Sequence, residues 1–246
     1  MRDEGLLKWE IFVMTKINSI VNPISDSTTD KNSNKLHFPF LVFEGLDGAG
    51  KSTLINAVKN YLISNSHSVV TTREPGGTEL GEQLRKLILQ KDGDHPTPRC
   101  ELLLYEAIRA HHVDKLIKPA IENKNWVLCD RFTGSSIAFQ GGGRSISKEE
   151  VIWLNKFATS NLKPDLTILI DISEEESRKR RQNRESSSGE KQDRIESENS
   201  DFHQKVRDSF LEQSKQENWL VLSAQDTVEK LLDNVISKLK EKKWLV

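Results

Sequence analysis

The chain is poor in cysteine, has no long apolar run and has no excess of one charge. Its two cysteines, Cys100 and Cys129, cannot form the disulfide framework of a small secreted protein. No apolar stretch approaches the length of a membrane span. The 36 basic and 37 acidic residues give a net charge of −1, whereas broad nucleic-acid binding depends on a strongly basic surface. We therefore predict a cytoplasmic protein with no membrane partner and no nucleic-acid partner.

Metal-binding patterns of histidine and cysteine are also missing from the sequence. The six histidines show no metal-ligand spacing, and His111 and His112 are adjacent, so in a helix they point to different faces. We interpret both as ordinary surface or core residues. Cys129 lies in an apolar run and is interpreted as a small buried side chain.

The first 38 residues differ in composition from the rest of the chain. Leu6–Met14 is mildly apolar, and Asn18–Lys35 is rich in Ser, Thr, Asn and Asp, a composition that cannot bury a core. We predict a flexible leader over residues 1–38, and acidic residues near its start argue against a signal peptide. Met14 is an alternative start for the protein.

From residue 39 onward, short apolar runs alternate with helix-like segments. Each run is nearly continuous, as expected for parallel strands that are buried on both faces. Ser147 and Ser173 have capping-box spacing at two helix starts, and Asp226 has related spacing before a last helix, Thr227–Lys240. Five strand–helix units predict one doubly wound α/β domain with a parallel sheet flanked by helices. The predicted strands are Phe40–Phe43, Val69–Arg73, Trp126–Asp130, Leu166–Asp171 and Trp219–Leu222.

The segment from Gly45 to Ser52 reads GLDGAGKS and matches the phosphate-loop pattern GxxxxGK(S/T). An apolar run precedes it and a helix-like run follows it. Backbone N–H groups of such a loop bind phosphate oxygens, and the helix dipole adds partial positive charge. Lys51 would reach the β- and γ-phosphates, and the Ser52 hydroxyl would bind Mg²⁺. The predicted ATP-binding residues are Gly45, Gly48, Ala49, Gly50, Lys51, Ser52 and Thr53.

Two other strand ends carry charged side chains. Arg73, in the segment TREPGGT, follows the second predicted strand and could bind a phosphate through two hydrogen bonds. Asp130 ends the third strand, at the position of a carboxylate that holds Mg²⁺ through water, and Arg131 follows it directly. An ordinary ion pair at a strand end is the alternative interpretation. Beside a phosphate loop, we favour anion and metal binding.

Another group of residues offers contacts for a nucleobase. Tyr105 and Arg109 are four residues apart in the helix-like run ELLLYEAIRAHH and therefore share a face. The ring could stack on a base while the arginine hydrogen-bonds a base carbonyl. Phe139 and Gln140, beside three glycines that permit close backbone approach, add an apolar wall and an amide. Taken alone, the Tyr105–Arg109 pair is more often a helix surface contact, and the glycine segment fits a flexible hairpin equally well.

A basic run, RKRRQNR from Arg178 to Arg184, leads into a polar, glycine-containing segment typical of a mobile lid. Arginines that close over a transferred phosphoryl group stabilise its charge and exclude water. A solvated face and a nucleic-acid patch are the alternatives, and the neutral overall charge weakens the second. Anion-binding arginines outside the phosphate loop, Arg73 and Arg131, indicate a second phosphorylated substrate. The sequence thus favours a kinase acting on a mononucleotide over a simple ATPase.

Several segments, taken in order, resemble the thymidylate kinase family: FEGLDGAGKST, TREPGGT, LLLYEAIRA, DRFTGSSIAFQGGGR, PDLTILID and DRIE. The resemblance spans about Phe40 to Val221. It implies a three-layer P-loop nucleoside-monophosphate-kinase fold, transfer of the ATP γ-phosphoryl group to dTMP with Mg²⁺, and a homodimer. Residues 39–246 would form the kinase domain, with a lid at about residues 180–195.

The resemblance also implies residue roles at the phosphate end of the acceptor. Asp47 corresponds to an acidic residue near the acceptor's 3′-hydroxyl and phosphate, and Arg73 and Arg131 to arginines that hold that phosphate. Gly48 stands where one subtype carries an arginine, so the chain resembles the common bacterial type, in which a lid arginine assists transfer. Arg184 and Arg181 are the candidates for that arginine. The predicted catalytic residues are Lys51, Asp47, Arg131 and Arg184, and the predicted metal ligands are Ser52 and Asp130.

At the base end, the resemblance implies that Tyr105 takes the place of an aromatic residue that stacks on thymine. Arg109 matches an arginine that contacts a thymine carbonyl, and Ser136 and Gln140 match polar positions that contact the base. Phe139 stands where the family usually has a tyrosine that crowds out a ribose 2′-hydroxyl. The substitution keeps the bulk of the ring and loses a hydroxyl.

Two alternative functions stay open on the sequence. Another kinase of the same class would phosphorylate UMP, dCMP or AMP, which the set Tyr105, Arg109, Phe139 and Gln140 disfavours. A nucleotide-gated switch of the GTPase kind would show an N-K-x-D base motif. The nearest string, Asn123–Trp126, lacks the acidic residue.

Overall fold

A computed structural model describes residues 38–246, except residues 190, 217 and 246. The predicted leader therefore lies outside the described residues, apart from residue 38. In the described part, five parallel strands form one sheet, as the sequence predicts. Their order in the sheet is β2-β3-β1-β4-β5. The strands are β1 (Phe40–Glu44), β2 (Val69–Arg73), β3 (Trp126–Asp130), β4 (Leu166–Asp171) and β5 (Trp219–Ser223).

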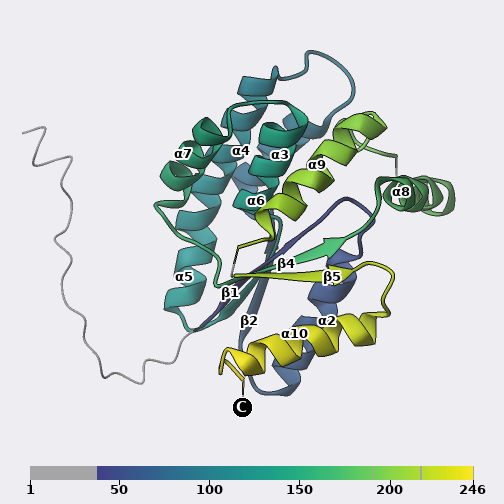
Figure 1. The fold of residues 1–246 in the computed structure, drawn as a ribbon. Helices are drawn as coiled ribbons and strands as arrows, with labels where there is room; N and C mark the ends of the chain where they lie inside the picture. The colour runs from purple at the N-terminus through teal and green to yellow at the C-terminus, as the bar shows by residue number, and fades with distance from the viewer. Residues whose placement is uncertain (1–37, 190, 217, 246) are drawn as a thin grey trace, which may run out of the picture. The chain divides into compact units, whose positions relative to one another are not determined.

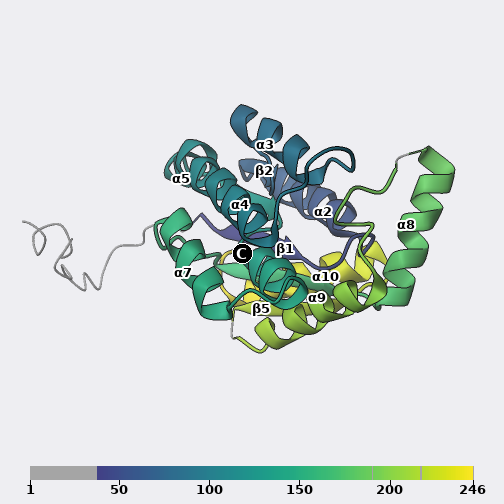
Figure 2. The same ribbon diagram turned by 90° about the horizontal axis from the view of Figure 1, so that it is seen from above.

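Helices cover both faces of the sheet (Figure 1). α2 and α10 pack together against one face, while α5 and α9 lie against the other. The helices are α2 (Lys51–Ser64), α3 (Glu79–Leu89), α4 (Pro98–His112), α5 (Lys118–Glu122), α6 (Thr133–Ser136), α7 (Lys148–Thr159), α8 (Glu174–Ser188), α9 (Ser200–Gln213) and α10 (Val228–Glu241), with π-helical turns η1 (Val113–Ile117) and η2 (Ile137–Gly143). Figure 2 shows α8 standing out from the other helices. No helix in the described ranges is long and apolar enough to span a membrane.

The central strand β1 is buried on both sides because its side chains alternate between two apolar clusters. Leu41 and Phe43 pack in a cluster that includes α2 and α10. Phe40 and Val42 pack in a second cluster that includes η1 and α5. Alternation along an extended chain sends successive side chains to opposite faces, so an uninterrupted apolar run is what a doubly covered strand requires.

Side-chain caps explain where several helices begin. The hydroxyls of Ser147 and Ser173 each accept a hydrogen bond from the backbone N–H three residues later, which confirms the predicted caps of α7 and α8. The prediction for the last helix is wrong by one residue. α10 is capped by Thr227, not by Asp226, and runs from Val228 to Glu241. Asp226 instead accepts from Lys230 Nζ at 2.6 Å, because its side chain is drawn to an opposite charge one turn into the helix.

Parallel pairing brings the carboxyl ends of β1, β2 and β3 to one edge of the sheet. Asp130 at the end of β3 is in register with Phe43 on one side and with Arg73 on the other. The loop that follows β1 and the charged residues that follow β2 and β3 therefore lie side by side. This edge is the usual ligand-binding position of an open parallel sheet.

Candidate active site

The loop after β1 has the backbone geometry of an anion cradle. Three of its glycines have positive φ, of 135°, 80° and 101° for Gly45, Gly48 and Gly50, a region that L-residues with a Cβ avoid. Lys51, buried at the start of α2, donates from Nζ to the carbonyl oxygens of Gly45 and Leu46 at 3.2 and 3.1 Å. These bonds fold the lysine back over the loop. Its ammonium group therefore lies where a phosphate held by the loop would need a counter-charge.

Ser52 and Asp130 form a small cluster of oxygen atoms beside the loop. Ser52 Oγ lies 3.5 Å from Asp130 Oδ2. The second carboxylate oxygen, Asp130 Oδ1, is buried, and the described residues offer it no hydrogen-bond partner. No group of three or more His, Cys, Asp or Glu side chains in the described ranges could hold a metal on its own. A hydroxyl and a carboxylate with a spare oxygen suit Mg²⁺, which prefers oxygen and keeps several waters.

Arg131, the residue after β3, connects this edge of the sheet to the phosphate loop. Its φ of 70° is rare for a residue with a side chain, and such strain often occurs at functional positions. Nη2 donates to Asp47 Oδ1 at 2.8 Å and Nη1 to Ser135 Oγ at 3.2 Å. The guanidinium carbon lies 4.9 Å from the centroid of the Phe139 ring. The guanidinium is thus fixed on three sides.

Asp47 is ionised because of its cationic neighbours. Burial alone would favour the neutral carboxyl, but the charges of Arg131 and Lys51 outweigh it and hold the pKa of Asp47 well below its usual range. Asp47 therefore carries a full negative charge at neutral pH. That charge keeps Arg131 in place and partly balances the two cations around the loop.

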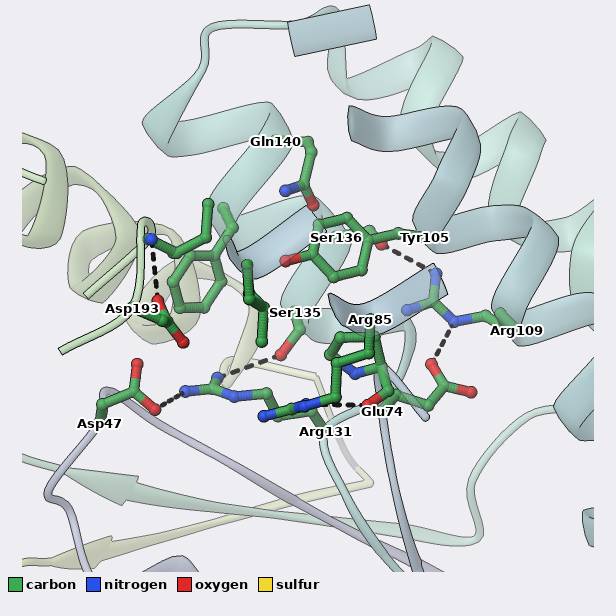
Figure 3. A pocket seen from close by; sticks show the side chains of 14 residues that line it. Asp47, Glu74, Arg85, Tyr105, Arg109, Arg131, Ser135, Ser136, Gln140 and Asp193 are labelled. Atoms are coloured by element: carbon green, nitrogen blue, oxygen red, sulfur yellow. Dashed lines mark hydrogen bonds and ion pairs between the residues drawn. The ribbon is translucent and has the colours of Figure 1, made fainter. Parts of the chain in front are cut away.

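A cavity lies between α4, η2 and the loop edge, and we call it the aromatic cavity (Figure 3). Tyr105 and Gln140 lie at one end, and Asp47 and Arg131 lie at the other. All the predicted acceptor-binding residues line it except Arg73. The lining residues are Asp47, Glu74, Pro75, Arg85, Leu89, Tyr105, Arg109, Arg131, Ser135, Ser136, Phe139, Gln140, Asp193 and Ile195.

A second cavity, the phosphate-loop cavity, lies over the loop itself. Five of the seven predicted ATP-binding residues line it, all but Gly45 and Ala49. The metal candidate Asp130 lines it too, together with Arg73 and Arg184. Arg73 is 55% exposed and pairs with Glu82 at 3.0 Å, so it faces this cavity and not the aromatic one. The two cavities share a wall. Its residues are Asp47, Glu74, Arg85, Leu89, Arg131 and Asp193.

Arg109 is at the centre of a buried polar network on the wall of the aromatic cavity. Only 1% exposed, it donates from Nε to Glu74 Oε2 at 2.7 Å and from Nη1 to Glu106 Oε1 at 2.6 Å. Nη1 also lies 2.8 Å from Ser136 Oγ and 2.7 Å from Asn155 Oδ1. Two carboxylates and several dipoles therefore compensate the buried charge of Arg109. These contacts fix the plane of its guanidinium.

Two neighbours at the aromatic end are also oriented by the protein. The amide of Gln140 donates from Nε2 to Glu101 Oε1 at 2.9 Å, which leaves its carbonyl oxygen to face a ligand. Burial, and then the charge of Glu101, raise the pKa of the Tyr105 phenol above its ordinary value. Tyr105 therefore stays neutral and presents an uncharged ring.

The lid arginines predicted from the sequence have different surroundings. Arg181 is buried, with Nη1 3.1 Å from Ser177 Oγ, and it lines neither cavity. Ser177 in turn donates to the backbone oxygen of Asp47 at 2.7 Å, so this pair braces the phosphate loop from behind. Arg184 lines the phosphate-loop cavity and donates from Nη2 to Glu196 at 2.6 Å. Of the two candidates, only Arg184 lies where a polyphosphate would be.

In the three-glycine run Gly141–Gly143, Gly142 and Gly143 serve packing, not ligand approach. The run lies in η2, against α9. A Cβ on Gly142 would come 3.1 Å from Lys205 O, and one on Gly143 would come 2.4 Å from the Phe202 ring. The close contact that these glycines permit is therefore with a neighbouring helix.

Several residues of the site were not identified from the sequence. Glu44, fully buried at the end of β1, accepts from the backbone N–H of Phe132 and Ser135 at 3.0 Å and so shapes the loop that carries Arg131. Glu74, Arg85 and Asp193 line the shared wall. Their charges look like surface charges in the sequence. For Glu44, Glu74 and Asp193 the available signal was their position inside the quoted segments FEGLDGAGKST, TREPGGT and DRIE, and Arg85 carried no such signal.

The parallel sheet, the phosphate loop and the second cavity beside it define a P-loop protein with the nucleoside-monophosphate-kinase fold. The family model described as thymidylate kinase matches residues 43–235. The chain belongs to the thymidylate kinase family.

Curated relatives and a solved structure agree with this assignment. The chain is 54% identical over 208 residues to a thymidylate kinase of Bdellovibrio bacteriovorus, covering 84% of this chain and 97% of that protein. It is 41% identical over 208 residues to one of Prochlorococcus marinus, covering 82% and 96%. The crystal structure of thymidylate kinase from Ehrlichia chaffeensis matches with a TM-score of 0.66 and 32% identity, covering 83% of this chain and 99% of that one.

Proposed function

We infer that the protein is a thymidylate kinase, which transfers the γ-phosphoryl group of ATP to dTMP and gives dTDP and ADP. The observation that carries this inference is the common wall of the two cavities. One cavity suits a polyphosphate over the glycine loop. The other has an aromatic and amide end and a cationic end, as a mononucleotide requires. The reacting phosphates would meet at Asp47 and Arg131.

In this proposal, the protein speeds the reaction by positioning the two substrates and neutralising the charge of their phosphates. Phosphoryl transfer requires little covalent chemistry from the protein, and the acceptor is already an anion. Lys51 would neutralise the donor phosphates, and Arg131, held by Asp47, would hold the acceptor phosphate in line. Arg184 would add positive charge from a lid at about residues 180–195. Arg73 would reach the reacting phosphates from the phosphate-loop cavity.

At the other end of the aromatic cavity, the base would lie against Tyr105. Arg109, Ser136 and the carbonyl oxygen of Gln140 would face its polar edge. Phe139, a buried ring beside Arg131, would fill the space that a ribose 2′-hydroxyl needs. This division assigns base recognition to α4 and η2 and phosphate recognition to the strand ends.

Ser52 and Asp130 would hold Mg²⁺, Ser52 directly and Asp130 through water. The buried, unpartnered Asp130 Oδ1 supports this role among the described residues, because a buried carboxylate oxygen ordinarily has a partner. When bound there, Mg²⁺ would help to neutralise the charge that develops on the donor phosphates.

An acceptor panel tests the proposed function. With ATP and Mg²⁺, turnover should be fastest with dTMP among dTMP, dUMP, UMP, dCMP and AMP. A higher kcat/KM for another monophosphate would identify a different kinase of the same class. ATP hydrolysis that no monophosphate accelerates would indicate a nucleotide switch instead. A version starting at Met14 should match the full chain if residues 1–13 have no part in catalysis.

A homodimer is proposed through the face formed by α4 and α7, which pack together. Trp153 and Phe157 on α7 are 64% and 76% exposed and stacked with centroids 6.0 Å apart, and Leu103 on α4 is also exposed. Large apolar groups exposed together commonly mark an interface, and a second copy offers the same groups across a two-fold axis. Light scattering should give a dimer for the native chain and a monomer for Trp153→Glu combined with Phe157→Glu. Leu87→Glu, on exposed α3, is the control.

A cytoplasmic setting is proposed as well. The free thiols of Cys100 and Cys129 are consistent with a reducing compartment. The near-neutral charge supports the expectation that nucleic acid is not a partner. Fractionation of cells that produce the full chain would test the location directly.

A further inference from the structure

His112, at the end of α4, is completely buried and lies between two side chains of the TREPGGT segment. Its Nδ1 is 2.9 Å from Glu74 Oε1 and its Nε2 is 2.7 Å from Thr72 Oγ1. Thr72 belongs to β2, and Glu74 follows that strand. One imidazole therefore joins the end of β2 to α4. It does not line the aromatic cavity, so it cannot contact a ligand there.

The partners fix the direction of these hydrogen bonds. An ionised Glu74 can only accept, so His112 must donate from Nδ1–H. In the neutral imidazole, Nε2 is then the acceptor, and the hydroxyl of Thr72 donates to it. The space for this arrangement depends on Gly77, where a Cβ would come 2.5 Å from His112 Nε2 and 2.6 Å from Thr72 Oγ1.

Glu74 passes this constraint to Arg109. Each carboxylate oxygen has its own partner, His112 on Oε1 and Arg109 Nε on Oε2 at 2.7 Å. Glu74 is 4% exposed, so water does not compete for either oxygen. If His112 stopped donating, Arg109 alone would hold the carboxylate, which could then turn about that one contact and shift the guanidinium.

Arg109 has one hydrogen left for a ligand. A guanidinium carries five N–H groups. Nε donates to Glu74, and the Nη1 hydrogens are shared by Glu106, Ser136 and Asn155. Nη2 donates to the backbone oxygen of Phe132 at 3.1 Å, and among the described residues its second hydrogen has no acceptor. Because Arg109 lines the aromatic cavity, that hydrogen is the one available to a base carbonyl.

We propose that His112 is a positioning residue for the acceptor, which acts by holding the Glu74 carboxylate so that Arg109 points its remaining N–H at the base. The proposal rests on the proposed function, because it concerns how that acceptor is bound. It assigns a role in recognition to a side chain outside the cavity. The alternative is that His112 contributes only to packing and stability.

Three single variants separate positioning from packing. His112→Leu removes both hydrogen bonds and keeps an apolar side chain. His112→Asn keeps the donor to Glu74, because an asparagine amide nitrogen can occupy the Nδ1 position, and loses only the contact with Thr72. His111→Leu is the matched control, since His111 is the preceding residue on the same helix and is only partly buried.

The measurements are KM for dTMP, KM for ATP, kcat and the melting temperature. His112→Leu should raise KM for dTMP about tenfold, the ratio that corresponds to about 1.4 kcal/mol of binding free energy. KM for ATP should stay within about twofold, since the phosphate loop is untouched. His112→Asn should recover most of the loss in KM for dTMP, and His111→Leu should resemble the native enzyme.

A double-mutant cycle with Arg109→Lys tests the route of the effect. If His112 acts through Arg109, the two substitutions together should raise KM for dTMP by much less than the product of their separate effects. Independent effects that multiply would overturn the proposal.

Each remaining outcome is also decisive. A lower melting temperature with unchanged KM for dTMP in His112→Leu would show a structural role only and overturn the proposal. Should that variant fail to fold, His112→Asn and His112→Gln decide. Gln can reach Thr72 but not replace the Nδ1 donor, so equal KM values for Asn and Gln would contradict the proposed role. If the native enzyme itself shows no turnover with dTMP, the proposed function fails, and the inference falls with it.

Discussion

Arg131 Nη2 lies 2.8 Å from Asp47 Oδ1, so a guanidinium at the end of β3 is bound to a carboxylate inside the phosphate loop. The contact joins the two cavities at their common wall. Movement of the loop on binding a nucleotide would therefore move the group that faces the acceptor. Asp47 thus has a positioning role in addition to any contact with substrate.

Arg131→Met should lower kcat for dTMP by about 10²–10³-fold, the usual effect of removing one preorganised charge from a transition state. Steady-state kinetics with a melting curve would show whether the loss is in turnover. Asp47→Asn should give a smaller loss of kcat, because it weakens the contact between residue 47 and Arg131 but keeps the Arg131 guanidinium. An Arg131→Met enzyme with native kcat would contradict the assignment of the acceptor phosphate to this residue.

Arg109→Ala should mainly raise KM for dTMP, because Arg109 would contact the base, far from the transferred phosphate. It should also destabilise the fold by about 3–5 kcal/mol, since Glu106 would lose the guanidinium that pairs with it and Glu74 would keep only His112. Urea unfolding measures the second effect, and Arg109→Lys, which keeps a charge, should be milder in both. Native KM for dTMP in the folded Ala variant would refute the base-pocket assignment.

Arg184→Met should reduce kcat by about 10²-fold or more with little change in stability, as expected for a lid group that acts only in the transition state. Arg178→Met is the matched control, because Arg178 is on the same helix, is 52% exposed and lines neither cavity. Arg181→Met should mainly lower the melting temperature. If it instead abolished turnover with stability intact, Arg181 would be the lid arginine and Arg184 would not.

His203 should make the protein less stable at mildly acidic pH. Burial, and then the charge of Arg181, lower its pKa below the ordinary value of 6.5, although Asp47, Glu196 and Glu174 act in the opposite direction. The unfolded chain takes up a proton near about pH 6.5 and the folded chain resists it, so stability is full above that pH and is lost as pH falls below it. Melting temperatures at about pH 7.5 and about pH 5.5 should therefore differ less in His203→Phe than in the native chain. An equal difference would exclude this source of pH dependence.

The two cysteines should react very differently with iodoacetamide. Cys100 is exposed, whereas Cys129 is buried in β3. Burial, and to a smaller extent the charge of Glu74, raises the pKa of the Cys129 thiol well above its usual value. The thiolate is the reactive form, so native protein should be labelled at Cys100 alone. Peptide mass mapping before and after denaturation would show this. Labelling of Cys129 in the native state would mean that β3 opens readily.

All five predicted runs became strands. Burial on both faces was correct for β1, β3 and β4 but wrong for β2 and β5, which lie at the edges of the sheet and are only partly buried. The predicted cap of α10 was wrong by one residue because Asp226 and Thr227 are both good capping residues. Sequence spacing alone does not decide between two such neighbours. The backbone geometry of the preceding turn does.

The buried charges were not predictable from spacing. Glu74 and Glu106 look like surface residues in the sequence, and only packing of α4 against the strand ends turns them inward toward the predicted Arg109. The same limit applies to Arg181 and Arg184, three residues apart on α8. They lie on nearly the same side of the helix, but Arg184 is one turn further along, where it reaches the phosphate-loop cavity, whereas Arg181 packs against Ser177. The sequence does not contain the position of the loop relative to that helix.

The shared wall between the two cavities has a pharmacological consequence. A single compound that carries a polyphosphate at one end and a pyrimidine at the other could occupy both cavities without crossing bulk water. Joining two weak binders in this way makes the second contact intramolecular, so affinity can rise by about 10²–10⁴-fold with no new interaction. The best tether would be the one whose length just spans the gap beside Arg131.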